Sequence, residues 1–369
     1  MTVDLAIAGG GPAGLAVAIR ACQAGLSALV LERAAGAPDK ACGEGLMPAG
    51  VRSLASLGAL DGIPGDQRFP FAGIRYVQED GGAVEARFSA GPGLGVRRTA
   101  LAAALAARAV SLGATLRRCA VRGYLRLDAG AADGAGVLVE TDAGEVRARL
   151  LVAADGINSP LRQSSGLARA TSEPRRYGLR RHFALAPWSS FVDVHWARGL
   201  ECYLTPVGPA RVNVAFLWED EAIGEKASFE SLLARFPEVG KRLRGVAVES
   251  EARGSGPLFR PVRARVSDRV ALVGDAAGYV DAITGQGLSL AFASAALLVK
   301  ALPRPLELAA LPAALRRYDR SLRGAWLRYA LPARALLALA RRPRARQTAL
   351  RLLARTPRLF GALLDAVAA

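Results

Sequence analysis

Two short apolar runs, separated by one helical stretch, open the chain. Residues 3–8 form a largely apolar run with no helical period, which predicts a buried strand. Apolar residues then recur at helical spacing as far as Gly25, a residue suited to a helix C-terminus. Residues 26–31 form a second apolar run, which ends at Glu32. This order of strand, helix and strand predicts a βαβ unit with parallel strands.

Helical and strand-like segments continue to alternate as far as residue 154. The alternation of polar and apolar residues at 71–88 predicts a β-hairpin. The other segments predict two helices, at 51–60 and 100–112, and strands at 115–126, 137–141 and 147–154.

Between residues 169 and 261 the pattern changes to strand-like segments separated by turns, which predicts an inserted antiparallel sheet. Its segments lie at 180–185, 191–196, 200–205 and 212–218, with a short helix at 229–236. A buried strand at 270–273 then precedes a long helix at 288–302. In the tail that follows, Ala, Leu and Arg recur at helical spacing, and prolines should divide it into short helices: Pro312, Pro332, Pro343 and Pro357.

These patterns predict an α/β fold in three parts. Residues 1–168 and 262–302 would form an α/β domain built on the βαβ unit, and residues 169–261 an inserted β-sheet domain. Residues 303–369 would form an arginine-rich region of C-terminal helices.

The net charge of +17 is concentrated in this tail, where fourteen arginines are opposed only by Glu307, Asp319 and Asp365. Few aromatic residues lie between these arginines, so we expect no nucleic-acid partner. The alternatives left open are a solvated face and a peripheral contact with a membrane surface.

Cysteine and histidine are too sparse for a disulfide framework or a metal site. The four cysteines form no C-x-x-C pair, and only two histidines occur. No uninterrupted apolar stretch of about 18 residues is present, and the first strand begins too early to leave room for a signal peptide. We therefore expect a cytoplasmic location, and membrane association through the tail is the alternative left open.

The turn between the first strand and the first helix carries a dinucleotide-binding motif, Gly9-Gly10-Gly11-Pro12-Ala13-Gly14. Gly9 permits the tight turn, Gly11 lets the backbone approach a pyrophosphate, and Gly14 lets helix and strand pack closely. Amides at the helix N-terminus would face the phosphates. Glu32, followed by Arg33, lies where a carboxylate accepts hydrogen bonds from ribose hydroxyls. The motif therefore predicts a site for the ADP-ribose of FAD or NAD.

Two further motifs follow in order: residues 154–162, Ala-Asp-Gly-Ile-Asn-Ser-Pro-Leu-Arg, and residues 273–277, Val-Gly-Asp-Ala-Ala. Together with the glycine turn, they resemble the FAD-dependent monooxygenases of the para-hydroxybenzoate hydroxylase type and their sister group, the geranylgeranyl reductases. The resemblance covers roughly residues 1–300. It implies that residues 1–168 and 262–302 form a Rossmann-like FAD-binding domain of the GR2 type, a dinucleotide domain, and that the sheet of residues 169–261 holds the substrate. FAD would be the cofactor, and NADH or NADPH a transient reductant.

The resemblance also implies roles for individual residues. Asp275, after Gly274, would hold a ribityl hydroxyl, and the helix that begins near Gly287 would face the flavin pyrimidine. Arg98 would contact FAD, Val121 would lie against the adenine, and Asp155 would support the cofactor site. The full set of expected cofactor residues is Gly9, Gly11, Pro12, Ala13, Gly14, Glu32, Arg33, Cys42, Gly43, Gly45, Arg98, Val121, Asp155, Gly274, Asp275, Gly285, Gln286, Gly287 and Leu288.

The loop Cys42-Gly43-Glu44-Gly45 resembles the cysteine-containing loop of the geranylgeranyl reductases. Cys42 is either a proton donor beside the flavin or a small apolar filler, and Glu44 is either a general acid or a loop carboxylate. Cys42 and Glu44 are the candidate catalytic residues. His182 and His195 lie in predicted strands, where we expect core or surface roles.

Other residues point away from the reductases. Their substrate sheet carries Tyr-x-Trp-x-Phe-Pro, whereas this chain has Glu-Cys-Tyr-Leu-Thr-Pro at residues 201–206. Gly278 fits the reductases, but Ala282 stands where both groups commonly have proline. On balance the sequence favours a monooxygenase that hydroxylates a hydrophobic small molecule, aromatic, polyketide or isoprenoid. The alternatives are a reductase of prenyl-lipid double bonds and a non-catalytic basic binding protein with structural FAD.

Overall fold

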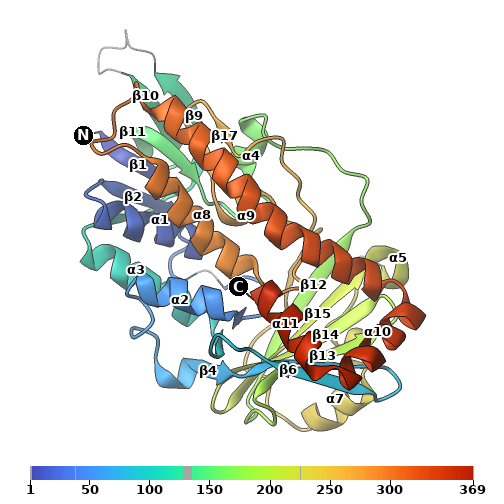
Figure 1. Ribbon diagram of the computed structural model, residues 1–369. Coiled ribbons are helices and arrows are strands. Elements are labelled where there is room, and N and C mark those ends of the chain that lie inside the picture. Colours follow the sequence, from blue (N-terminus) through green and yellow to red (C-terminus); the bar gives the residue numbers. More distant parts are fainter. Residues whose placement is uncertain (1, 38, 128–134, 225, 369) are drawn as a thin grey trace.

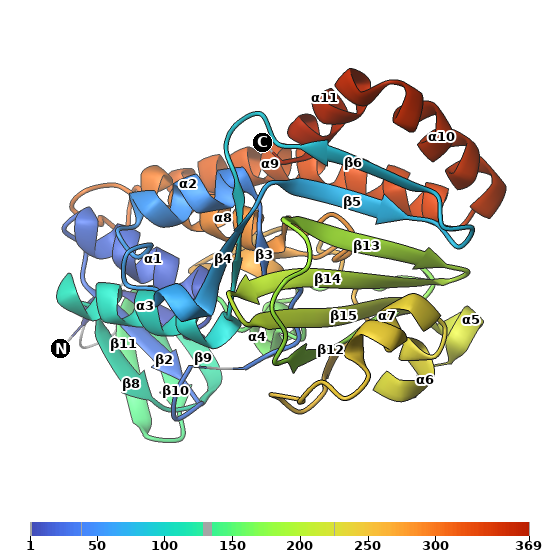
Figure 2. The same cartoon turned by 90° about the horizontal axis from the view of Figure 1, so that it is seen from below.

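Two large sheets, a small third sheet and a C-terminal group of helices make up the described part of the molecule. The computed structural model describes residues 2–37, 39–127, 135–224 and 226–368. The first sheet, with its helices, occupies one end of the molecule, and the second sheet occupies the other (Figure 1). The C-terminal helices run from the first sheet to the edge of the second (Figure 2).

The first sheet has the order β17-β18-β11-β1-β2-β8, with β10 paired to β11 and β9 paired to β10. Strand β1 pairs in parallel with both β2 and β11, which confirms the predicted βαβ unit. Helices α1, α3 and α8 pack beside one another on this sheet, and Leu5, Ile7, Leu15 and Ile19 are fully buried in its core. The elements are β1 Val3–Ala8, α1 Pro12–Gln23, β2 Ala28–Glu32, α3 Arg98–Ser111, β8 Thr115–Arg118, β9 Val121–Leu127, β10 Gly136–Thr141, β11 Gly144–Ala153, α4 Pro160–Ser164, β17 Val266–Ser267, β18 Val270–Leu272, η2 Gly274–Ala277 and α8 Gly287–Ala301.

The second sheet has seven strands in the order β16-β12-β15-β14-β13-β5-β6 and is antiparallel except where β5 meets β13. A small sheet of order β3-β7-β4 lies between it and the first sheet. The elements are β3 Gly45–Leu46, α2 Pro48–Ser56, η1 Gly65–Gln67, β4 Arg68–Phe71, β5 Gly73–Val77, β6 Ala83–Arg87, β7 Gly93–Val96, β12 Arg176–Phe183, β13 Phe191–Ala197, β14 Leu200–Gly208, β15 Arg211–Glu219, α5 Asp220–Ile223, α6 Phe229–Leu233, α7 Pro237–Leu243 and β16 Arg253–Ser255.

The hairpin β5–β6 belongs to this second sheet, although the expected boundary assigned all of residues 1–168 to the dinucleotide domain. The hairpin itself was predicted from its alternation. Its partner could not be, because Gly73 pairs with Phe191, far along the chain. The sheet that would hold the substrate is therefore built from both halves of the sequence.

The tail forms one long helix and two shorter ones: α9 Leu311–Ala340, α10 Pro343–Arg355 and α11 Pro357–Ala368. Pro343 and Pro357 begin helices as expected, but Pro332 lies inside α9 and does not end it. A proline inside a helix costs about 3 kcal/mol. The fully or nearly fully buried Tyr318, Leu322 and Ala333 supply the packing that offsets this cost. Among the described residues, the structure contains no helix long and apolar enough to cross a membrane.

A buried arginine joins the second sheet to the segment that follows β18. Nε of Arg176, on β12, donates to Asp281 at 2.9 Å, and Nη2 donates to Glu201 on β14 at 2.6 Å. All three side chains are buried. Burial by itself would lower the pKa of Arg176, but Glu201 and Asp281 raise it above its ordinary value. The arginine therefore stays charged, and the two carboxylates depend on it.

We expect Arg176→Met to destabilise the protein by about 3–5 kcal/mol, because it leaves two buried carboxylates without their cation. The measurement is the midpoint of urea unfolding. Arg253→Met is the matched control, because its ion pair with Glu251 on the same sheet is exposed and should contribute less than about 1 kcal/mol. Equal losses in both variants would contradict this account.

Candidate functional site

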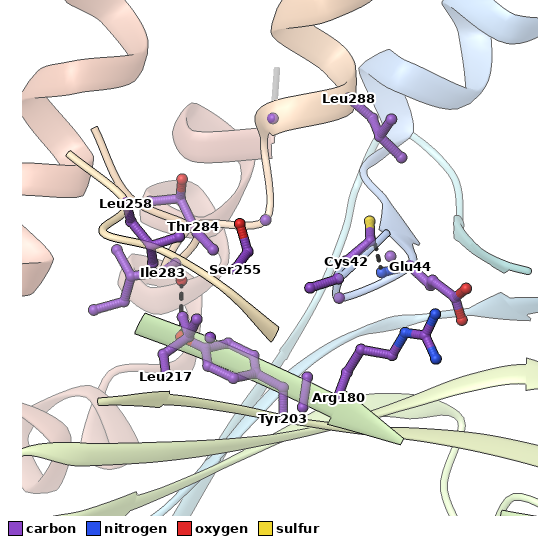
Figure 3. Close-up of a pocket in the computed structure, with 18 of the residues that line it drawn as sticks. Cys42, Glu44, Arg180, Tyr203, Leu217, Ser255, Leu258, Ile283, Thr284 and Leu288 are labelled. Atoms are coloured by element: carbon purple, nitrogen blue, oxygen red, sulfur yellow. Dashed lines mark hydrogen bonds between the residues drawn. The ribbon is translucent and has the colours of Figure 1, made fainter. Parts of the chain in front are cut away.

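A cavity of about 1260 Å³ lies between the two sheets and reaches the C-terminal helices. Its walls include the glycine turn, the loop 39–45, the motif that begins at Asp155 and the start of α8. The inner face of the second sheet supplies another wall, and Figure 3 shows Tyr203 and Leu217 there, opposite Cys42 and Leu288. Residues of the separate sequence motifs thus line one cavity.

The glycine turn adopts a backbone that side chains would not permit. Gly9 has φ +110°, and a Cβ on it would lie 2.4 Å from the carbonyl oxygen of Ala154. A Cβ on Gly14 would lie 2.0 Å from the carbonyl oxygen of Gly9. Gly11 lines the cavity, and Nη2 of Arg98 would be the nearest atom to its Cβ, at 3.6 Å. The backbone of the turn is therefore open to the cavity on the side where Arg98 lies.

Glu32 closes β2 and holds this turn in place. Its Oε2 accepts a hydrogen bond from the amide of Gly10 at 2.7 Å, and Oε1 accepts one from Ala34 at 2.9 Å. Val121 begins β9 nearby, since the amide of Cys119 donates to the carbonyl of Glu32. Of the expected cofactor residues, these lie behind the cavity wall instead of on it: Gly9, Gly14, Glu32, Val121, Gly274 and Gln286.

Several buried polar atoms at the cavity have no hydrogen-bond partner among the described residues: Arg98 Nη1, Asp155 Oδ1 and Thr284 Oγ1. The same is true of Gln286 Oε1 and Ser289 Oγ, which follow Thr284 in the chain. A buried polar group without a partner is costly, so such atoms mark where a ligand would bind. Burial raises the pKa of Asp155 and of Asp275, and it lowers that of Lys40. Cations and carboxyl groups therefore converge on the cavity, where the charges of Arg98 and Lys40 oppose the effect of burial on Asp275.

These residues fit FAD. Arg98 and the amides of the glycine turn would hold the pyrophosphate, and Asp275 would hold the ribityl chain. The N-terminus of α8, with Gly287 and Leu288 on the cavity wall, would face the flavin. Gly285, with φ +66°, also lines the cavity.

The cysteine loop passes along the edge of the same cavity. Sγ of Cys42 accepts a hydrogen bond from the amide of Glu44 at 3.3 Å, and Asn213 on β15 donates to the carbonyl of Cys42 at 3.0 Å. Figure 3 shows the sulfur on the side of the loop that faces Leu288. Burial raises the pKa of Cys42, so its thiol remains protonated at neutral pH. A protonated thiol at this position can give a proton to a bound molecule.

Glu44 is fully engaged by its neighbours. Its Oε1 accepts from the amide of Arg98 at 2.7 Å and from Nη1 of Arg97 at 2.9 Å, and its Oε2 contacts Nε2 of His182 at 2.7 Å. The residue has φ +59°, a strained value for a side chain other than glycine. The carboxylate thus fixes the loop that carries Cys42. A role of Glu44 as general acid stays a prediction.

Both histidines have the core or surface role expected of them. His182 lies fully buried on β12, outside the cavity lining, and its Nδ1 contacts Oγ of Ser250 at 2.8 Å. Burial lowers the pKa of His195 to about 4. What sequence reasoning missed is the contact of His182 with Glu44, because the two residues are 138 positions apart and no local pattern could reveal the pair.

Much of the remaining cavity wall is apolar, although Arg180, Lys226 and Arg253 also line it. The second sheet supplies Ile74, Val192 and Val194, and the tail supplies Leu336, Leu339, Leu350, Leu353, Phe360 and Leu364. The sequence did not assign the tail to the site. Tyr203 and Thr205 line the cavity, but Glu201 is bound to Arg176. Of the three positions on β14 that are aromatic in the reductases, two, Tyr203 and Thr205, therefore line the cavity.

We expect Arg98→Ala to weaken FAD binding by about 10- to 100-fold, because a charge-assisted hydrogen bond contributes about 1.5–3 kcal/mol. The measurement is the FAD dissociation constant by fluorescence titration. Arg108→Ala on the same helix is the matched control and should bind FAD like the parent, since Arg108 contacts the carbonyl of Leu57 and lies off the cavity. Unchanged binding in Arg98→Ala would show that the cofactor lies elsewhere.

We expect the thiol of Cys42 to react with iodoacetamide along a pH profile displaced above that of free cysteine, because only the thiolate reacts and burial raises the pKa. Peptide mass spectrometry isolates Cys42 from the other cysteines. Normalising each profile to its own plateau separates the pKa from access to the site. A midpoint at or below that of free cysteine would contradict the assignment.

Known proteins share both the sequence and the fold. The FAD binding domain family matches residues 2–205. Digeranylgeranylglycerophospholipid reductase 2 of Methanopyrus kandleri is 28% identical over 310 residues, 78% of this chain and 74% of that protein. Menaquinone reductase of Mycobacterium tuberculosis is 27% identical over 310 residues, 78% of this chain and 73% of that protein.

Among solved structures, the flavin-dependent brominase Bmp2 superposes with a TM-score of 0.84 at 17% identity, over 100% of this chain and 94% of that one. The superposition confirms the predicted FAD-binding fold, and the sequence matches confirm the resemblance to the geranylgeranyl reductases. The chain is a flavoprotein that belongs to the FAD binding domain family.

Proposed function

We propose that this flavoprotein reduces a carbon–carbon double bond in a long hydrophobic substrate of the isoprenoid lipid class. The carrying observation is the composition of the cavity, in which a wall of aliphatic side chains from two sheet strands and three helices leads to the loop of Cys42. The names of two relatives denote reductases of digeranylgeranylglycerophospholipid and of menaquinone, which supports the same class of reaction.

The aliphatic wall changes the preference drawn from sequence, which favoured hydroxylation. That preference depended on the segment 201–206, and Glu201 is directed into the ion pair with Arg176. The tail supplies apolar wall residues that the sequence comparison could not include. A wall of Leu336, Leu339, Leu350 and Leu353 suits a flexible chain of methylene and methyl groups, because it offers contact area without hydrogen-bonding groups.

In this proposal, proton donation, positioning of the cysteine loop and exclusion of water are carried out by different residues. Bound FAD, reduced by NADH or NADPH, supplies the hydride equivalent. The thiol of Cys42 donates the proton to the other carbon of the double bond, and the resulting thiolate regains a proton from water. Glu44 and His182 hold the cysteine loop, and the aliphatic wall keeps water from the reacting carbons.

Monooxygenation is the second candidate, and the aromatic part of the wall favours it. The rings of Tyr76, Tyr177 and Tyr203 line the cavity from the second sheet, where a flat aromatic substrate could stack. The hydroxyl of Tyr203 donates to the carbonyl of Ile283 at 3.2 Å, which fixes its ring at the wall.

The deciding experiment follows product mass with a geranylgeranyl lipid and reduced nicotinamide, under strict anaerobiosis and under labelled oxygen. We expect anaerobic gain of two hydrogens per double bond. Cys42→Ala should lower this rate by about 10²–10⁴-fold, the range for loss of a general acid. Cys22→Ala, outside the cavity on α1, is the matched control and should match the parent.

Incorporation of labelled oxygen with no anaerobic product would support monooxygenation and overturn the reductase proposal. Tight FAD binding without turnover under either condition would support the non-catalytic alternative. Full activity in Cys42→Ala would remove the thiol from the mechanism.

A further inference from the structure

The outer face of the C-terminal helices is apolar where a soluble surface would be polar. Five of the nine large apolar side chains that are exposed in the described part of the chain lie on α9, α10 and α11. The most exposed are Leu331 at 65% and Leu352 at 57%, and the others are Leu327, Leu359 and Leu363. Leu359 and Leu363 are four residues apart on α11, as are Leu327 and Leu331 on α9, so each pair forms a stripe along its helix.

The cavity reaches the surface at this face, as it also does near Lys40, Asn158 and Arg253. Ala335 on α9 and Leu363 and Ala366 on α11 are exposed to solvent, and all three also line the cavity. Ala335 continues the stripe of Leu327 and Leu331, because it lies four residues further along α9. The cavity therefore opens between α9 and α11, and exposed leucines border this opening on both helices.

The arginines on and next to α10 and α11 include two sets. Arg341, Arg346 and Arg351 pair with Glu219, Glu79 and Asp80, and Arg346 is the buried member of this set. Arg344, Arg355 and Arg358 are exposed and have no acidic partner within 4.0 Å among the described residues. The first set has acidic partners on β15 and in the turn of the hairpin β5–β6, and the second set leaves positive charge without an acidic partner on the surface.

The acidic residue of α11 is also turned inward. Asp365 accepts a hydrogen bond from the amide of Ser89 at 2.9 Å, next to the hairpin β5–β6. The outer face of α10 and α11 consequently combines exposed leucines with uncompensated arginines. This combination is typical of helices that lie in the interface of an anionic bilayer.

We infer that α9, α10 and α11 dock on an anionic lipid bilayer, with the opening between α9 and α11 facing the acyl chains. The leucines would enter the interface, and Arg344, Arg355 and Arg358 would contact lipid phosphates. A hydrophobic substrate could then pass from the bilayer into the cavity without crossing water. The delivery step rests on the proposed function, whereas the docking does not.

A bilayer explains the surface better than a nucleic acid does. A nucleic-acid face needs arginines without apolar neighbours, or aromatic rings on which bases stack. Here the exposed arginines alternate with leucines, and Phe360, the aromatic residue of α11, is buried. Binding of a nucleic acid would also not explain why the apolar stripes border the cavity opening.

Flotation with vesicles tests the docking directly. We expect the FAD-loaded protein to float with vesicles of phosphatidylglycerol and phosphatidylcholine, and at least tenfold less with phosphatidylcholine alone. Leu352→Glu/Leu359→Glu should reduce flotation on the anionic vesicles at least tenfold, and Arg355→Gln/Arg358→Gln should reduce it and weaken its dependence on salt. Val110→Glu/Leu125→Glu is the matched control, because these two residues are equally exposed but lie on α3 and β9.

Failure of the parent to float, or equal flotation of the leucine variant, would overturn the docking. So would a control variant that loses flotation to the same degree as the leucine variant. Binding of the parent to duplex DNA at physiological salt in place of vesicles would overturn it in favour of a nucleic-acid surface.

A second measurement separates docking from chemistry. Leu352 and Leu359 do not line the cavity, so their double variant should reduce substrate dispersed in detergent at the parent rate. With the substrate embedded in anionic vesicles, its rate should fall by the same factor as its flotation. Equal rates on vesicles would overturn the delivery route. Absence of reduction in both formats, with flotation retained, would refute the proposed function and leave the docking intact.

Discussion

The site exists because buried charges hold two separately built sheets at a fixed distance. Glu44 on the cysteine loop is bound to His182 of the second sheet and to the backbone of α3. Arg176 of the same sheet is bound to Asp281, between η2 and α8. Glu44 lines the cavity, whereas His182, Arg176 and Asp281 lie outside it, and together the two contacts set the cavity's width. Buried charges lose much more when one partner shifts than apolar contacts do, so they fix this distance more sharply than packing could.

The cavity is divided chemically along its length. Near the glycine turn it presents cations, carboxyl groups and a helix N-terminus, which suit a charged cofactor. Toward α9 to α11 it presents leucine, valine and alanine, which suit a molecule with few polar groups. Cys42 lies on the loop between these two regions, with its thiol kept protonated by burial. The division explains how relatives that share the FAD-binding part can differ in what they act on, because the second region is built from other elements.

The sequence predicted what is local and missed what is distant. The βαβ unit, the glycine turn and the start of α8 follow from patterns of a few residues, and the order of three motifs identified the cofactor. The pairing of β5 with β13, the contact of Glu44 with His182 and the contribution of the tail to the cavity join segments more than a hundred residues apart. The continuity of α9 through Pro332 was missed for a related reason, since the packing that stabilises it comes from other elements.

The position of the aliphatic wall in the chain has a consequence for biosynthesis. A ribosome completes the glycine turn, the cysteine loop and α8 before it adds α10 and α11, and N-terminal parts of a chain generally fold first. The cofactor region can therefore form while the other end of the cavity still lacks its cover. FAD would meet an open cleft on the nascent protein, and the last helices would close over a cavity already filled at its polar end. The order of the elements along the chain would thus allow FAD to bind before the last helices cover the cavity.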